Sequence, residues 1–223
     1  MDSRLAKWLR WFKIVEGEVQ DLVVAKHIFH EIQGMIRDNP RLHQYSSFYD
    51  YFSNTYVSHV IIGVRRQVKC GNLKDGNQSI SMACLFKEMM ATPETFTRAH
   101  YTAKYKGSAK EGYANITFDK FAASGAPHIN PDLVVADLSR LQAAAKHCED
   151  FADKRVAHRD KREPKELPIF NEIDTCIDLL DELYVKYFLL FHASGMETLL
   201  PTWQYDWTSI FRVPWLPVSE EEI

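Results

Sequence analysis

The sequence predicts an all-α protein: a helical bundle of four to five long helices with an aromatic-rich C-terminal strap. Apolar residues recur at three- and four-residue spacing along several long segments, which is the period of an amphipathic helix. No segment sustains the alternation of a strand, and proline, asparagine or glycine follows most of the helical patterns. The chain has 223 residues, of which 46% are hydrophobic and 13% aromatic. This length and composition predict a single domain over residues 1–223.

The first part of the chain predicts three helices. Residues 1–16 place large aromatic side chains among basic ones, so we expect a short amphipathic helix that packs on the protein's own core, with a membrane-surface helix as the alternative. Residues 17–37 carry the next apolar pattern, which Asn39-Pro40 ends. Residues 45–69 carry another, which finishes in basic side chains that suit a helix C-terminus.

A shorter helix and an irregular region follow. Residues 80–90 are largely apolar, and either Ser79 or Ser81 is placed to cap their N-terminus. Residues 93–130 show no sustained period and become rich in glycine, alanine and proline. We expect this region to be an excursion from the bundle, rigid or mobile, with one or two short helices.

The remaining chain predicts two long helices and the strap. Pro131 and Asp132 open the first helix with residue types that the first turn favours. Its apolar seam recurs every three or four residues, at Val134, Leu138, Leu141, Ala145, Cys148, Ala152 and Val156. Residues 170–193 form the second helix, and Gly195 is its expected stop. Residues 199–223 are too aromatic for a disordered tail and predict a strap across the bundle, with a partner-binding motif as the alternative.

Composition and motifs argue against several classes of function. The net charge of -3 argues against wholesale coating of nucleic acid, so a site for a polyanion would be local. The sequence has no Gly-rich phosphate loop, no Gly-x-Ser-x-Gly and no metal-ligand spacing, so we expect no cofactor and no metal. No apolar run is long enough for a membrane span or a signal peptide, and we expect a cytoplasmic protein with no membrane partner. The widely spaced cysteines predict buried free thiols in a reducing compartment: Cys70, Cys84, Cys148 and Cys176.

A basic cluster closes the long helix that begins at Pro131. Residues 154–165 hold six Lys or Arg against two Asp or Glu, and His158 lies among them. Because residues three and four apart share a helix face, Arg155, His158, Arg159 and Arg162 form one stripe that prolongs the apolar seam. This placement favours an interface with a second helix or a second subunit. The structural alternative is a solvated helix end, where the helix dipole attracts basic side chains.

The basic stripe holds the minimal chemistry for RNA cleavage. Histidine takes or gives a proton near neutral pH, and arginine binds phosphate bidentately and stabilises charge that develops on it. RNA supplies its own nucleophile, the 2′-hydroxyl. A metal ion is therefore not required for this reaction.

Several segments resemble the HEPN superfamily, and most closely its abortive-infection, AbiU-like branch. Residues 153–160 (Asp-Lys-Arg-Val-Ala-His-Arg-Asp) resemble its signature late in a long helix. Residues 64–67 (Val-Arg-Arg-Gln) and 79–81 (Ser-Ile-Ser) resemble the arginine pair and helix start of that branch, and residues 206–215 resemble its aromatic ending. The resemblance implies a helical bundle, often a homodimer whose motifs meet in a cleft. In active members it implies metal-independent RNA cleavage by toxins or phage-defence effectors.

The resemblance also implies roles for individual residues. The superfamily motif is an arginine, a polar residue, several further residues and a histidine, and Ala152 stands where the arginine is expected. The catalytic residues implied are His158, Arg155 and Asp153. The RNA- or phosphate-binding residues implied are Arg159, Arg162, Lys154, Arg65 and Arg66. The implied partners are RNA, a second copy of the chain, and an antitoxin or defence-system protein.

Ala152 leaves three alternatives. Arg155 or Arg159 replaces the missing arginine from a neighbouring turn, or the Arg65-Arg66 pair reaches the motif in space. In the third alternative the chain does not cleave RNA. It then binds RNA, nucleotide or a protein partner through the same basic cleft.

Overall fold

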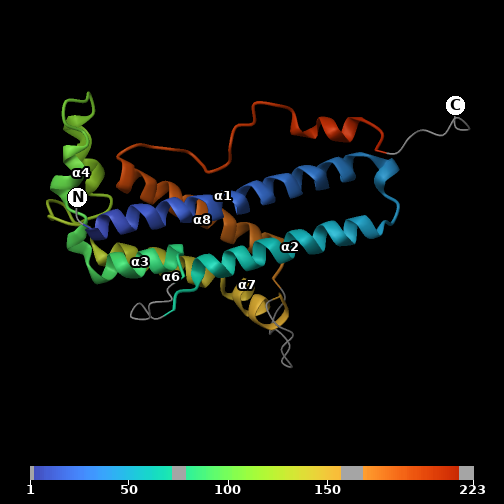
Figure 1. The fold of residues 1–223 in the computed structure, drawn as a ribbon, viewed down its shortest axis with the longest axis horizontal. Coiled ribbons are helices and arrows are strands. Elements are labelled where there is room, and N and C mark those ends of the chain that lie inside the picture. Colours follow the sequence, from blue (N-terminus) through green and yellow to red (C-terminus); the bar gives the residue numbers. More distant parts are fainter. Residues whose placement is uncertain (1–2, 72–78, 157–167, 216–223) are drawn as a thin grey trace, which may run out of the picture.

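The computed structural model describes residues 3–71, 79–156 and 168–215. Over these ranges the chain is an all-α bundle, as the sequence predicts, and β structure is limited to one isolated bridge between Thr97 and His128. The elements that organise the bundle are α1 (Ser3–Asp38), α2 (Ser47–Val68), α3 (Met82–Ala91), α6 (Pro131–Ala144), α7 (Lys146–Phe151) and α8 (Phe170–His192). Figure 1 shows α1 along the long axis of the molecule, with α2 beside one half of it. None of the helices in these ranges has the length and apolar character needed to cross a membrane.

The helix α1 joins two segments that the sequence predicts as separate helices. The helix continues through Gly17, since no proline follows to end it. Its buried face includes Trp8, Phe12 and Val15, and the Phe12 ring stacks on Tyr184 of α8 with 4.3 Å between ring centroids. The prediction that the N-terminal aromatic residues pack on the protein's own core is therefore confirmed.

The helix α2 returns alongside α1 after a short connection. The connection contains one 3-10 turn, η1 (Pro40–Leu42), and the Ser46 side chain caps α2 by accepting a hydrogen bond from the Phe48 backbone N–H. Gly63 of α2 faces Leu22 of α1, and a Cβ added at Gly63 would lie only 2.4 Å from the Cδ2 atom of Leu22. The absence of a side chain at Gly63 therefore lets the two helices approach closely.

A disulfide bond ties the end of α2 to α3. It joins Cys70 to Cys84, so the prediction that these two cysteines are free thiols is wrong. The pairing has no local motif, because the partners come together only when α3 folds back on α2. Cys148 and Cys176 are free and buried, as predicted. Of the two candidate caps for α3, Ser81 takes the role, since its side chain accepts a hydrogen bond from the Cys84 backbone N–H at 3.1 Å.

Residues 93–130 are irregular, as predicted. Their short elements are η2 (Pro93–Thr95), α4 (Arg98–Ala103), η3 (Glu111–Tyr113) and α5 (Ala114–Phe118). The Arg98 guanidinium donates to the Ala126 carbonyl at 2.8 Å and to the Asp119 carboxylate at 2.6 Å. Tyr101 and Phe118 are fully buried beneath this network. One arginine thus connects both ends of the excursion.

The continuous helix predicted over residues 131–156 is interrupted. Asn130 caps α6 as its side chain accepts from the backbone of the first turn, but α6 ends at Ala144. The Cys176 thiol of α8 donates to the Ala144 carbonyl at 3.1 Å. In an unbroken helix that carbonyl would pair with the Cys148 N–H, so the inserted thiol explains the break.

The apolar seam of this segment is nevertheless buried in the bundle. Its buried members are Val134, Leu138, Leu141, Ala145, Cys148 and Ala152. After α7 the chain continues into a π-helical turn, η4 (Ala152–Val156), which lies against α2. As far as Ala152, the seam therefore packs on helices of the same chain and does not present a face to a second subunit.

The helix α8 runs through the bundle beside α1. Its N-terminus is closed by the Glu172 carboxylate, which accepts a hydrogen bond from the Ile169 backbone N–H at 3.0 Å. Its last residue is His192, and Ala193 follows as the C-cap with a left-handed backbone, at φ of 54°. The stop is thus two residues before the predicted Gly195.

The C-terminal segment forms the predicted strap, which we define as residues 199–215. Leu199 is 3% exposed, and the Trp203 ring stacks on His27 of α1 with 5.0 Å between centroids. The strap contains one 3-10 helix, η5 (Trp207–Arg212), and runs back along α1 (Figure 1). The residues beyond 215 lie outside the described ranges.

Candidate functional site

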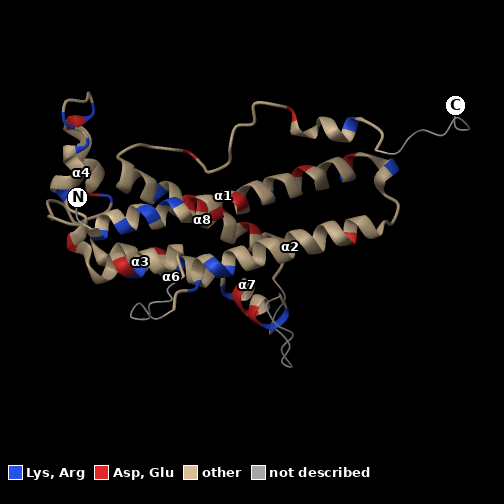
Figure 2. Ribbon diagram, in the orientation of Figure 1, with Lys and Arg blue, Asp and Glu red and all other residues tan. Residues whose placement is uncertain are grey.

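The candidate site is centred on η4, where this π-helical turn packs against α2. Figure 2 shows acidic positions on α7 and basic positions on the adjoining turn, close to the basic end of α2. Ala152 is fully buried, whereas Asp153, Lys154 and Arg155 are half-buried. A π-helical turn widens the backbone and redirects the side chains that follow it, and such turns are frequent at functional sites.

Asp153 receives two basic side chains from α2. Its carboxylate accepts a hydrogen bond from Arg65 Nε at 2.5 Å and from Lys69 Nζ at 2.5 Å. Partial burial raises the pKa of Asp153, but the hydrogen bonds and charges of Lys69 and Arg65 outweigh it and hold the pKa below its usual value. The carboxylate is therefore ionised at neutral pH and anchors η4 to α2.

Further ion pairs surround this anchor. Lys69 also reaches Glu149 of α7 at 3.5 Å, and Lys154 pairs with Asp150 one turn before it at 2.7 Å. Each of these two lysines is thus matched by a carboxylate. The described part of the cluster is close to charge balance, so its cations are partly neutralised before any phosphate arrives.

The predicted site residues do not all lie together in the structure. Of the Arg65-Arg66 pair, only Arg65 reaches Asp153. Arg66 points to the other side of α2, where its guanidinium lies 4.0 Å from Glu18. The Arg155 guanidinium donates to the Lys154 carbonyl at 3.2 Å. The other predicted residues, His158, Arg159 and Arg162, lie outside the described ranges.

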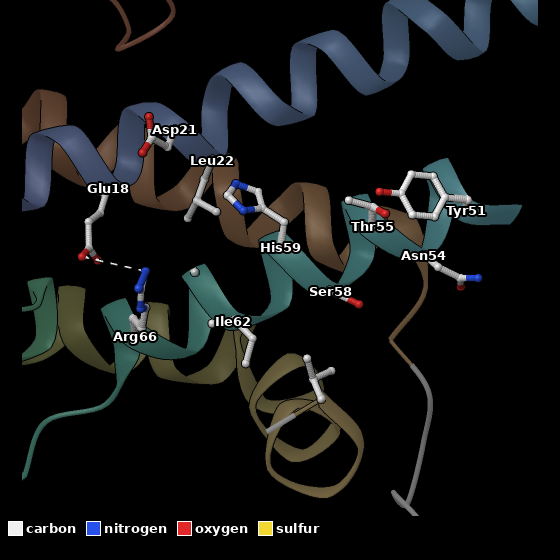
Figure 3. A pocket seen from close by; sticks show the side chains of 12 residues that line it. Glu18, Asp21, Leu22, Tyr51, Asn54, Thr55, Ser58, His59, Ile62 and Arg66 are labelled. Atoms are coloured by element: carbon white, nitrogen blue, oxygen red, sulfur yellow. Dashed lines mark ion pairs between the residues drawn. The ribbon is translucent and has the colours of Figure 1, made fainter. Parts of the chain in front are cut away.

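An open groove of about 750 Å³ lies between α1 and α2. Figure 3 shows His59 and Arg66 extending from α2 towards α1, which contributes Glu18 and Asp21. The lining also includes Val156, the last residue of η4. The groove and the ion-paired turn are therefore adjoining parts of one region.

Sequence reasoning named Arg65, Arg66 and Asp153 but missed Lys69 and Glu149 of the ion-paired cluster and the other polar residues of the groove. Arg65 and Lys69 are four residues apart, and so are Glu149 and Asp153, so each pair occupies one helix face. That complementary spacing is a usable signal, although it does not reveal which helices pack together. His59 lies among other exposed polar residues of α2, and a polar face on a mainly apolar helix is the corresponding signal for the groove.

The fold and the site define a class: an all-α bundle protein with an ion-paired π-helical turn beside an open groove of mixed polar and apolar lining. Within the described ranges, no group of three or more His, Cys, Asp or Glu side chains is arranged to hold a metal ion. In comparisons with known proteins, no family model, no curated protein and no solved structure matches the chain.

Proposed function

We propose that the chain is a HEPN-like RNA-binding protein that cleaves RNA without a metal, and that it acts as a toxin or phage-defence effector. The contact between Arg65 and Asp153, at 2.5 Å, carries this proposal. It places a guanidinium beside the polar residue of the motif, although the adjacent motif position is Ala152. The observation thus supports Arg65 as the spatial replacement for the missing arginine.

The proposed reaction uses the RNA's own 2′-hydroxyl. A base removes its proton, the 2′-oxygen attacks the adjacent phosphorus, and the bond from phosphorus to the 5′-oxygen breaks. The products are a 2′,3′-cyclic phosphate and a 5′-hydroxyl, whose oxygen takes up a proton. His158 is the proposed general acid or base, and Arg155 and Arg159 are the proposed phosphate clamp.

The test is incubation of the full chain with structured RNA in the presence of EDTA. Cleavage is expected for the natural protein and for His43→Ala, because His43 lies at the far end of the α1–α2 hairpin. Cleavage is expected to disappear in His158→Ala. If His158→Ala cleaves as fast as the natural protein, the proposed role of His158 is wrong.

We also propose a homodimer with an antitoxin or defence-system protein as a further partner, located in the cytoplasm. Since the seam is buried within the chain as far as Ala152, the dimer contact would use another surface. Sedimentation velocity at micromolar concentration is expected to give twice the monomer mass. A monomer under those conditions would contradict the dimer.

A second candidate is a non-catalytic protein of the same fold that binds RNA, nucleotide or a protein partner. The burial of Ala152 and the pairing of Lys69 and Lys154 with carboxylates favour it, because they leave fewer cations for a scissile phosphate. It predicts no turnover. If RNA is the ligand, binding should weaken steeply with salt as counterions compete.

A further inference from the structure

We propose that the groove between α1 and α2 binds the bases of single-stranded RNA. This inference rests on the proposed function and adds the place where the RNA is read. The groove's volume of about 750 Å³ lies in the range of small-molecule sites and accommodates a nucleotide. Because Val156 of η4 lines it, the groove begins at the end of the turn that carries Asp153.

An aromatic side chain offers a stacking surface in this groove. Tyr51 lines it and is 69% exposed, so most of its ring is not covered by the chain. Stacking of a base on such a ring contributes about 1–3 kcal/mol and tolerates any base, because every base has a π-face. Tyr51 therefore supplies affinity without selecting a sequence.

The polar lining suits the edge of an unpaired base. Asn54, Ser58 and His59 of α2 are exposed along the groove and provide both donors and acceptors. Base edges are accessible to side chains chiefly when the RNA is single-stranded, because the deep groove of an RNA duplex excludes them. The lining therefore favours a single strand over a duplex.

The acidic groups determine which part of a nucleotide enters. Glu18 accepts a hydrogen bond from Gln67 Nε2 at 2.6 Å and lies near Arg66, whereas Asp21 has no hydrogen-bond or ion-pair partner among the described residues. A carboxylate repels phosphate but accepts hydrogen bonds from the exocyclic amino group of a base. Asp21 therefore favours cytosine, adenine or guanine over uracil, which has no amino group.

The first arm of the test measures stacking. Binding of fluorescein-labelled oligocytidine and oligouridine is followed by fluorescence polarisation with the full-length chain. Tyr51→Ala is expected to weaken binding of both by at least about fivefold. Tyr205→Ala is the matched control, because Tyr205 is also 69% exposed but lies on the strap. It should bind like the natural protein.

The second arm measures base selection. Asp21→Asn is expected to reduce the preference for oligocytidine over oligouridine and to leave oligouridine binding unchanged or tighter. Glu31→Gln removes the same negative charge from an exposed position of α1 that does not line the groove. The preference for cytidine should persist in that control.

The outcomes separate this inference from the proposed function. If Tyr51→Ala binds as tightly as Tyr205→Ala while Arg155→Ala binds more weakly, the groove does not bind bases and the proposed function stands. If the natural protein binds neither oligonucleotide, both ideas fail. If the groove variants lose only a protein partner, the groove is a protein-binding surface and the inference is wrong. Thermal melting by circular dichroism checks that each variant is folded.

Discussion

At the scale of single residues, the burial of Ala152 bears on the proposed function, which expects an arginine at this position. Its side chain is fully buried in the seam, at the point where α7 passes into η4. An arginine there would have to enter the core, while Arg65 already brings a guanidinium to the next residue from α2. An arginine at position 152 would therefore be buried, whereas the guanidinium of Arg65 is already in contact with Asp153.

Restoring the motif arginine should damage the fold. Ala152→Arg is expected to lower the free energy of unfolding by about 3 kcal/mol or more, because the core must accept a larger side chain and an unpaired charge. Ala143→Arg is the control, since Ala143 is exposed on α6, and its effect should stay within about 0.5 kcal/mol. Urea unfolding of both variants measures the difference. Equal stabilities would contradict the burial of Ala152.

The Asp153 anchor should make stability depend on pH. Its pKa is lowered in the folded chain, so its contribution is fully present above the unfolded-state value of about 3.9 and is lost as the pH falls through the folded-state value. Asp153→Asn should cost about 1 kcal/mol at pH 7, because the 39%-exposed carboxylate is partly screened by solvent.

The cost of Asp153→Asn should shrink when urea unfolding is repeated below pH 4. Asp38→Asn provides the control, since Asp38 is 74% exposed and pairs with its neighbour Arg37, so a smaller effect is expected. A cost at pH 3 as large as that at pH 7 would show that the charge of Asp153 is not responsible.

At the scale of elements, the close contact of α1 and α2 depends on Gly63. An added methyl group would lie 2.4 Å from the Cδ2 atom of Leu22, which is 1% exposed, so the Leu22 side chain would have to shift from its packed position. Gly63→Ala should therefore destabilise the protein by about 1 kcal/mol or more, despite the better helix propensity of alanine. Gly17→Ala has open space around it and should stabilise by about 0.5–1 kcal/mol.

Thermal unfolding of these two glycine variants gives the comparison. The melting temperature of Gly63→Ala should fall below that of the natural protein, and that of Gly17→Ala should rise above it. A rise in both variants would mean that α1 and α2 are farther apart than the structure places them.

Local periodicity predicts most of the helices but not where they break or meet. The seam from Val134 to Ala152 can be predicted from the sequence, because its buried apolar residues repeat with the period of the helix. The break after Ala144 cannot be predicted from the local sequence. Its cause is the thiol of Cys176 in α8, more than 30 residues later, which donates to the Ala144 carbonyl. For the same reason, the site's ion pairs require the packing of α2 on α7, which no local pattern specifies.

At the scale of the whole molecule, the disulfide between Cys70 and Cys84 conflicts with the proposed cytoplasmic location. Cytoplasmic proteins are kept reduced, and disulfides persist mainly in oxidising compartments. The bond between Cys70 and Cys84 closes a loop with a sequence separation of 14, immediately after the end of α2. Lys69, which contacts Asp153, is the residue before Cys70. The disulfide therefore constrains the backbone next to Lys69, and its reduction would remove that constraint from the candidate site.

Reduction of the disulfide should destabilise the whole chain. A loop of this length corresponds to about 3 kcal/mol in the chain-entropy description of disulfides, because the bond restricts the unfolded state. Calorimetry with and without a phosphine reductant should show a lower melting temperature for the reduced protein. Cys70→Ser should unfold near the reduced natural protein and should not respond to reductant.

Mass spectrometry after alkylation under denaturing conditions reports the bond independently. Without reduction, only Cys148 and Cys176 should be alkylated. Acid quenching of intact cells, followed by alkylation under denaturing conditions, then shows whether the bond is present in the cell, because Cys84, Cys148 and Cys176 are fully buried in the folded chain. Four modified cysteines would support a reducing compartment and a chain that works without the bond, whereas two would place the folded protein in an oxidising one.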